Sequence, residues 1–126
     1  MSLRTDLARV RGLGSAKDGT AHWWAQRLTA LALVPLTLWL VVSLVALAGA
    51  DHAAVTAWIA RPVVAVLLTL AIVAGFHHAQ LGVQVVIEDY VHNEWLKLAS
   101  VVAVKFAAAA LGVAVVFSVL KIAFSG

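Results

Sequence analysis

The stretch Val63–Ile87 reads VVAVLLTLAIVAGFHHAQLGVQVVI and contains no Asp, Glu, Lys or Arg. A helix needs about 20 predominantly apolar residues to cross a hydrocarbon core of about 30 Å, and this stretch is longer than that. Lipid offers no hydrogen-bond partners to a polypeptide backbone, so a spanning segment must satisfy its own backbone groups. The stretch therefore predicts a transmembrane helix.

Two further runs have the same character. Leu28–Ala50 contains no charged residue, and Leu98–Leu120 contains only Lys105. Hydrophobic residues make up 63% of the 126-residue chain and charged residues only 12%, which is far from the balance of a soluble domain. The runs lack the strict alternation of membrane-barrel strands. The sequence predicts an all-α membrane protein with three transmembrane helices.

The charged residues before the first run predict the orientation. Basic residues outnumber acidic ones there: Arg4, Arg9, Arg11 and Lys17 stand against Asp6 and Asp18. By the positive-inside rule the N-terminus is cytoplasmic, and three spans then place the C-terminus in the periplasm. The first run is too long for the apolar part of a signal peptide, so we expect it to be retained. The net charge of +3 lies mostly in this tail, and no nucleic-acid partner is expected.

The organisation that follows is a single membrane-anchor domain, residues 1–126. Asp51 is expected to cap a short helix that ends near Ala60, Pro62 to occupy the first turn of the second span, and Pro35 to kink the first. The predicted segments are a cytoplasmic basic tail (1–21), three spans (22–50, 62–87 and 98–122), a periplasmic loop (51–61) and a cytoplasmic loop (88–97).

Two adjacent histidines interrupt the second run. At about 100° per residue, His78 shares a helix face with Gly75, Gly82 and Asp89, whereas His77 points to another face. A flat macrocycle needs empty space beside the imidazole that ligates it, and glycines one turn away on either side would supply that space. The chain has no cysteine, which excludes thiolate metal sites and iron–sulfur ligation within it. The pattern predicts that His78 is an axial ligand of a haem iron.

The spacing of the polar residues fits that prediction. His78 and Asp89 are eleven residues apart, or about 16 Å along a helix axis. A haem near the middle of the membrane could thus direct its propionates towards the cytoplasmic side, where Arg27 enters the membrane as a counter-ion. A second axial histidine would have to come from another chain. We therefore expect an obligate subunit with no activity of its own.

Each of these polar residues also has a simpler interpretation. The two histidines could be neutral and hydrogen-bonded between helices, and Arg27 and Lys105 could extend towards the headgroups. Asp89 and Tyr90 could belong to an interfacial belt. What favours the haem hypothesis is that Arg27 and the whole segment 78–90 fall in the same half of the membrane.

Two motifs carry a resemblance to a known family. The first is His22-Trp23 followed by Arg27, and the second is His78 followed, eleven residues on, by Asp89-Tyr90-Val91. Over nearly its whole length the chain resembles the small hydrophobic membrane-anchor subunits of succinate dehydrogenase, respiratory complex II, of the alphaproteobacterial and mitochondrial kind.

The resemblance implies a place in a four-subunit succinate:ubiquinone oxidoreductase of the bacterial inner membrane, in the tricarboxylic acid cycle and aerobic electron transport. The partners would be a flavoprotein, an iron–sulfur protein and a cytochrome b membrane subunit. His78 would co-ligate haem b with the cytochrome b subunit, and Arg27 would lie near the propionates. Tyr90 would bind ubiquinone, with Asp89 nearby. The basic tail and the loop 88–97 would contact the iron–sulfur subunit.

Three alternatives stay open at this stage. One is a quinol:fumarate reductase anchor, which runs the same chemistry in reverse. Another is a small transporter or channel subunit with a proton or ion path along His77, His78 and Lys105. The third is a purely structural anchor without a cofactor.

Overall fold

The computed structural model describes residues 3, 5–10 and 17–125. Within these residues every regular secondary-structure element is an α-helix. The helices are α1 (Asp6–Val10), α2 (Lys17–Ala46), α3 (His52–Ile59), α4 (Pro62–Tyr90) and α5 (Glu94–Phe124). Three of them are long and apolar enough to cross a membrane, over Gly19–Ala46, Pro62–Tyr90 and Glu94–Phe124. The prediction of an all-α protein with three transmembrane helices is confirmed.

The predicted basic tail is only partly covered by this description. Arg4 and Arg11 lie outside the described residues, and for Arg9 and Lys17 only the backbone is described. What the structure adds is that α2 begins at Lys17, before the position 22 at which the first span was expected to start.

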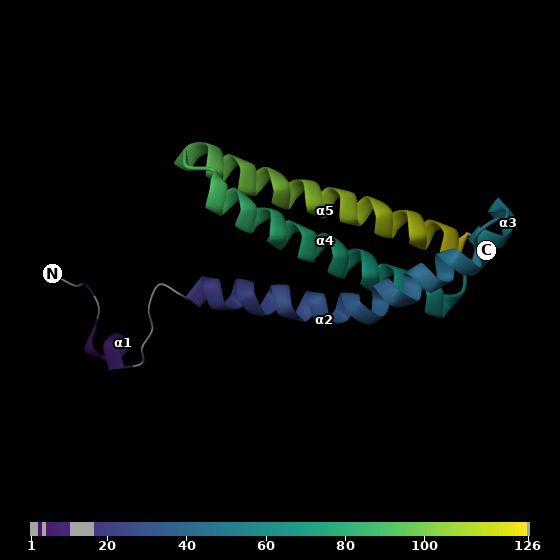
Figure 1. Ribbon diagram of the computed structural model, residues 1–126, viewed down its shortest axis with the longest axis horizontal. Coiled ribbons are helices and arrows are strands. Elements are labelled where there is room, and N and C mark those ends of the chain that lie inside the picture. The colour runs from purple at the N-terminus through teal and green to yellow at the C-terminus, as the bar shows by residue number, and fades with distance from the viewer. Residues whose placement is uncertain (1–2, 4, 11–16, 126) are drawn as a thin grey trace.

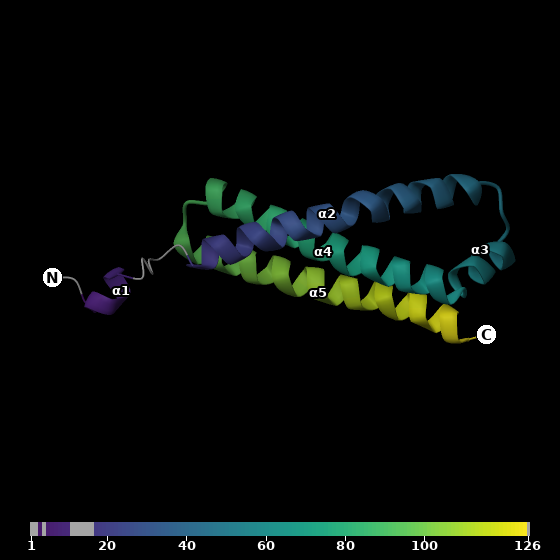
Figure 2. The same cartoon turned by 90° about the horizontal axis from the view of Figure 1, so that it is seen from below.

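Helix α4 is the centre of the molecule. Its neighbours α2 and α5 both pack against it, whereas α2 and α5 do not pack on each other within the described residues. Both ribbon views show α4 and α5 running side by side in opposite directions (Figures 1 and 2). The short α3 lies at the end of the bundle where the chain passes from α2 to α4. Residues on α4 can thus face either α2 or α5.

Local sequence signals mark most of the helix ends. The Asp51 carboxylate accepts a hydrogen bond from the Ala54 backbone N–H at 2.8 Å and so caps α3, as predicted. Pro62 is the first residue of α4, also as predicted. Asn93 caps α5 in the same way, accepting from the Leu96 N–H at 3.0 Å. Gly49 adopts a positive φ of 82° in the turn after α2, a conformation that glycine adopts without strain.

The helices differ from the expected spans at several ends. Helix α2 ends at Ala46 instead of Ala50, and it continues through Pro35 as a bent helix (Figure 1). Between α4 and α5 only residues 91–93 are non-helical, where a loop over 88–97 was expected. The reason is physical: hydropathy locates the hydrocarbon boundary, but a helix continues beyond it until a cap or a breaker stops it.

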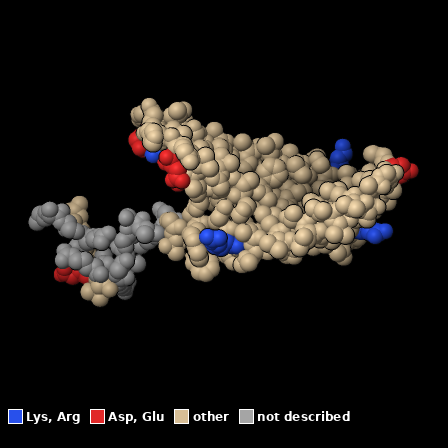
Figure 3. All heavy atoms as spheres, viewed as in Figure 1, with Lys and Arg blue, Asp and Glu red and all other residues tan. Residues whose placement is uncertain are grey.

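Little of the surface is buried within the chain. Among the described residues the buried cluster comprises Val64, Ala65, Leu68 and Val119, at the end of the bundle near α3. There the Trp39 and Trp58 rings stack with centroids 5.8 Å apart. Most large hydrophobic side chains along the three long helices are exposed. In Figure 3 the charged side chains visible on the face shown lie towards the ends, which leaves a long uncharged middle for lipid or partner helices.

Candidate functional site

The two histidines of α4 face different neighbours. His78 is half-buried and lies against α2, whereas His77 is exposed and lies in a groove between α4 and α5. The sequence prediction that they occupy separate helix faces is confirmed. The two imidazoles therefore have different surroundings and cannot exchange roles without a rotation of α4.

A hydrogen bond joins His78 to α2. Its Nδ1 lies 3.0 Å from the hydroxyl oxygen of Thr29. That hydroxyl oxygen also lies 2.7 Å from the backbone carbonyl oxygen of Ala25, which can only accept. The Thr29 hydroxyl is thus in contact both with its own helix backbone and with the His78 ring. The His78 Nε2 takes no part in this contact.

The glycines beside His78 lie near side chains of α2. A Cβ atom built on Gly75 would lie 4.0 Å from Leu33 Cδ2, and one on Gly82 would lie 3.9 Å from Gln26 Nε2. Both are ordinary van der Waals distances, so an alanine would also fit at either position. The predicted room for a macrocycle beside His78 stays a prediction.

The donor set of the site fits a haem better than a bare metal ion. The described residues hold no group of three or more His, Cys, Asp or Glu side chains that could bind a metal ion. A haem brings four nitrogen ligands of its own and needs only axial ones from protein. An imidazole whose Nδ1 is engaged and whose Nε2 is free meets that need for one axial position.

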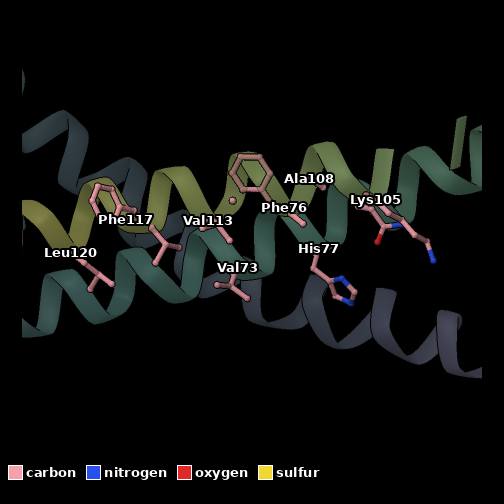
Figure 4. Close-up of a pocket in the computed structure, with 12 residues that line it drawn as sticks. Val73, Phe76, His77, Lys105, Ala108, Val113, Phe117 and Leu120 are labelled. Atoms are coloured by element: carbon pink, nitrogen blue, oxygen red, sulfur yellow. The ribbon is translucent and has the colours of Figure 1, made fainter. Parts of the chain in front are cut away.

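The groove on the other side of α4 has a volume of about 550 Å³ and an apolar wall. Its polar side chains are His77 and Gln80 from α4 and Lys105 from α5. Figure 4 shows His77 and Lys105 towards one end of the groove and Phe117 and Leu120 towards the other. An ionisable side chain within a spanning helix normally faces a partner chain or an aqueous cavity. We therefore regard this groove as a surface that another molecule covers.

A ladder of polar side chains runs along α4 from this groove. The Gln80 amide donates to Gln84 at 3.0 Å, and the Gln84 amide donates to Glu88 at 2.8 Å. Sequence reasoning missed this ladder, although the spacing of four residues between its members was a usable signal. It links the middle of α4 to its polar end.

Arg27 is exposed on the first turns of α2 and contacts an aromatic ring. Its guanidinium carbon lies 5.4 Å from the centroid of the Trp23 ring, within the range of a cation–π contact. Trp23 in turn packs edge-on against Trp24 at 4.9 Å. Among the residues whose side chains are described, no ion pair joins Arg27 to a carboxylate, and the ion pair found there joins Lys97 to Glu94. The exposed guanidinium of Arg27 is accessible to an anion.

Asp89 and Tyr90 form the last turn of α4, and both are exposed. Tyr90 is 78% exposed, which is high for an aromatic side chain. The end of α4 and the start of α2 lie at the same end of the bundle (Figure 1). The structure thus brings the Asp89–Tyr90 pair and Arg27 to the same end, with His78 further along α4.

Two buried polar atoms on α2 lack partners within the described structure. They are Nε2 of His22 and Oε1 of Gln26, one helical turn apart. Buried polar atoms in native proteins are nearly always hydrogen-bonded, to protein or to ordered water. These atoms therefore indicate that a water, a ligand or another chain completes this end of the bundle.

Comparison with known proteins gives a consistent result. The family model described as the transmembrane subunit of succinate dehydrogenase and fumarate reductase matches residues 1–119. The succinate dehydrogenase hydrophobic membrane anchor subunit of Rickettsia bellii is 37% identical over 81% of this chain and 82% of its own. That of Paracoccus denitrificans is 33% identical over 88% and 86%. The membrane anchor subunit of Reclinomonas americana is 28% identical over 68% and 73%. No solved structure matches the chain.

Proposed function

Because the chain belongs to the family of succinate dehydrogenase and fumarate reductase transmembrane subunits, we propose that it is the membrane anchor of a succinate:ubiquinone oxidoreductase in a bacterial inner membrane. It is a multi-pass membrane protein. It holds an iron–sulfur subunit and a flavoprotein subunit to the membrane and pairs with a cytochrome b subunit. The N-terminus faces the cytoplasm, on the side of the soluble subunits.

The observation that best supports this proposal is that α4 is a continuous helix. It is one uninterrupted helix over Pro62–Tyr90, so His78 and Tyr90 are fixed on a single rigid element. Their separation along the helix axis is about 18 Å. A redox group held at His78 would lie near the middle of the membrane, and a quinone held at Tyr90 would lie at its edge.

The haem role rests on His78 and Arg27. His78 would supply one axial nitrogen of a haem b, and the cytochrome b subunit would supply the other. Arg27, which has no carboxylate partner among the described residues, would pair with a haem propionate. When bound, a haem would supply a one-electron redox centre on the membrane-spanning part of α4.

The quinone role rests on Tyr90, with Asp89 beside it. Ubiquinone reduction adds two electrons and two protons, so the site needs donors directed at the carbonyl oxygens. The phenol of Tyr90 can donate a hydrogen bond to a neutral carbonyl while its ring tolerates apolar surroundings. Asp89 would orient neighbouring groups or pass protons from the cytoplasm.

The requirement for partners follows from what the chain leaves uncovered. Tyr90 is largely exposed, and His22 and Gln26 bury polar atoms without partners in the described structure. A quinone site whose tyrosine is this exposed to water or lipid would not bind its substrate selectively. Companion subunits would therefore complete both the quinone site and the haem site.

The decisive experiment is a visible absorption spectrum of the purified complex, oxidised and reduced, for wild type, His78→Ala and His77→Ala. Wild type should show a reducible b-type Soret band. His78→Ala should lose the band or shift it to that of a five-coordinate haem, because an axial ligand is gone. His77→Ala is the matched control and should keep the six-coordinate spectrum.

Two results would contradict the proposal. A wild-type complex without haem would leave the chain a purely structural anchor. Loss of the six-coordinate spectrum in His77→Ala, with His78→Ala unchanged, would move the ligand to the groove between α4 and α5.

A second candidate function is a quinol:fumarate reductase anchor, because the matching family includes both enzymes. The relatives named above are all described as succinate dehydrogenase subunits, which favours succinate oxidation. Steady-state rates of the same complex in both directions would decide: a faster fumarate reduction with quinol than succinate oxidation with quinone would support the second candidate.

A further inference from the structure

Thr29 is well placed to control the chemistry of His78 without touching any cofactor. It lies on α2, 49 positions before His78, and its hydroxyl oxygen is 3.0 Å from His78 Nδ1. The same oxygen is 2.7 Å from the Ala25 carbonyl and 3.1 Å from the Gln26 carbonyl. A hydroxyl has a single proton, and we assign it to the shortest of these three contacts, the one to the Ala25 carbonyl.

That assignment leaves Thr29 only lone pairs to offer to His78. The imidazole then donates its Nδ1 proton to the hydroxyl, and Nε2 is the nitrogen without a proton. A neutral imidazole has two tautomers, and only the unprotonated nitrogen can bind a metal. Without an acceptor at Nδ1, both tautomers and several ring rotations would be open to His78 in apolar surroundings.

We infer that Thr29 is a positioning residue for the haem iron, which fixes the tautomer and orientation of His78 so that Nε2 is presented for coordination. This inference rests on the proposed haem role of His78. When the ring nitrogen that does not bind the metal donates a hydrogen bond, the basicity of the nitrogen that binds the metal rises. Thr29 would thus stabilise the ferric haem relative to the ferrous and lower its midpoint potential.

The local packing supports a dedicated contact. Gly75 and Gly82 lie one turn on either side of His78, and a Cβ built on them would lie 4.0 Å and 3.9 Å from an α2 side chain. The two glycines thus add no side-chain bulk on the face where Thr29 meets His78. Thr29 shares with Thr69 the hydrogen bond to the carbonyl four residues earlier, which Thr69 makes to Ala65 at 2.8 Å, and differs from it by the added contact to an imidazole.

The test compares Thr29→Val, which keeps the shape and removes the hydroxyl, with Thr29→Ser, which keeps the hydroxyl. Thr37→Val is the matched control, because Thr37 is an exposed threonine of the same helix. The assembled four-subunit complex is used throughout. The readouts are the rate of haem transfer to excess apomyoglobin and the haem midpoint potential from a redox titration.

Thr29→Val should lose haem to apomyoglobin about 10–100-fold faster than wild type, the range for loss of an outer-shell partner of a metal ligand. Its midpoint potential should shift upwards. Thr29→Ser and Thr37→Val should stay close to wild type in both measurements. Wild-type transfer rate and potential in Thr29→Val would overturn the inference.

One further measurement keeps the inference testable if Thr29→Val does not assemble. Nitrogen-15 magnetic resonance of histidine-labelled wild-type complex should show a protonated, hydrogen-bonded Nδ1 on His78, and an unprotonated Nδ1 would refute the role of Thr29. Other results would contradict the proposed function and not only the role of Thr29. They are a wild-type complex without haem, and a His78→Ala complex with an unchanged spectrum, because either result would show that His78 does not ligate a haem.

Discussion

At the scale of single residues, the role proposed for Tyr90 depends on one hydroxyl group. Tyr90→Phe keeps the ring and removes the group that would donate to the quinone carbonyl. The loss of such a hydrogen bond costs about 1–3 kcal/mol, or roughly 5–150-fold in the efficiency of quinone reduction. The measurement is succinate-driven ubiquinone reduction by the purified complex.

The control for Tyr90→Phe is electron transfer from succinate to an artificial acceptor that draws from the soluble subunits. This rate should not change, because those subunits are untouched. Wild-type ubiquinone kinetics in Tyr90→Phe would make the tyrosine an interfacial residue and would place the quinone donor on a partner chain.

Single residues also show which features of the site could be predicted from the sequence. The separation of His77 from His78 could be predicted, because both lie on one helix and its period is known. The pairing of Thr29 with His78 could not, since it depends on how two helices rotate against each other. A signal was nevertheless present: Thr29 shares a face of α2 with His22 and Gln26, and three polar residues on one face of a span indicate a packed side.

At the scale of helices, the contact between α2 and α4 can be tested at Gly82. A Cβ on Gly82 would lie 3.9 Å from Gln26 Nε2, so alanine fits, and the further carbons of a leucine would have to displace Gln26. Gly82→Leu should force α2 away from α4 and destabilise their packing by about 1–3 kcal/mol. The measurement is the thermal denaturation midpoint of the detergent-solubilised complex, followed by loss of the haem band.

Gly19→Leu is the matched control for Gly82→Leu. Gly19 is also a helical glycine, and among the described residues no atom outside its own helix backbone and chain neighbours lies within 4 Å of a Cβ built there. Its substitution should leave the denaturation midpoint unchanged. An equal fall in both variants would mean that leucine disturbs insertion rather than the contact of α2 with α4.

The helix ends show which structural signals a sequence carries. Asp51 and Pro62 were predictable, because a capping carboxylate and a first-turn proline act within a few residues. The connection between α4 and α5 was predicted over 88–97 but spans only 91–93. Residues 88–90 and 94–97 are polar or interfacial yet helical, and hydropathy cannot distinguish a polar helical turn from a polar loop. Asn93 was the missed signal, since it caps α5.

At the scale of the whole molecule, the exposed apolar surface predicts dependence on partners. Within the described residues only Val64, Ala65, Leu68, Gln80, Leu81 and Val119 are buried. A three-helix chain with so small a core gains little stability from its own packing. Expressed without the cytochrome b subunit, it should be degraded several-fold faster than when the two are co-expressed. Pulse-chase measurement of its half-life in membranes checks this, and equal half-lives would contradict it.

The contact between Thr29 and His78 joins two helices that are synthesised one after the other. The chain leaves the ribosome N-terminus first, so Thr29 is made 49 positions before His78. When α4 is made, the partner for its imidazole is already present on an earlier helix of the same polypeptide. The contact can thus form within one chain, without a second subunit that has to arrive by diffusion.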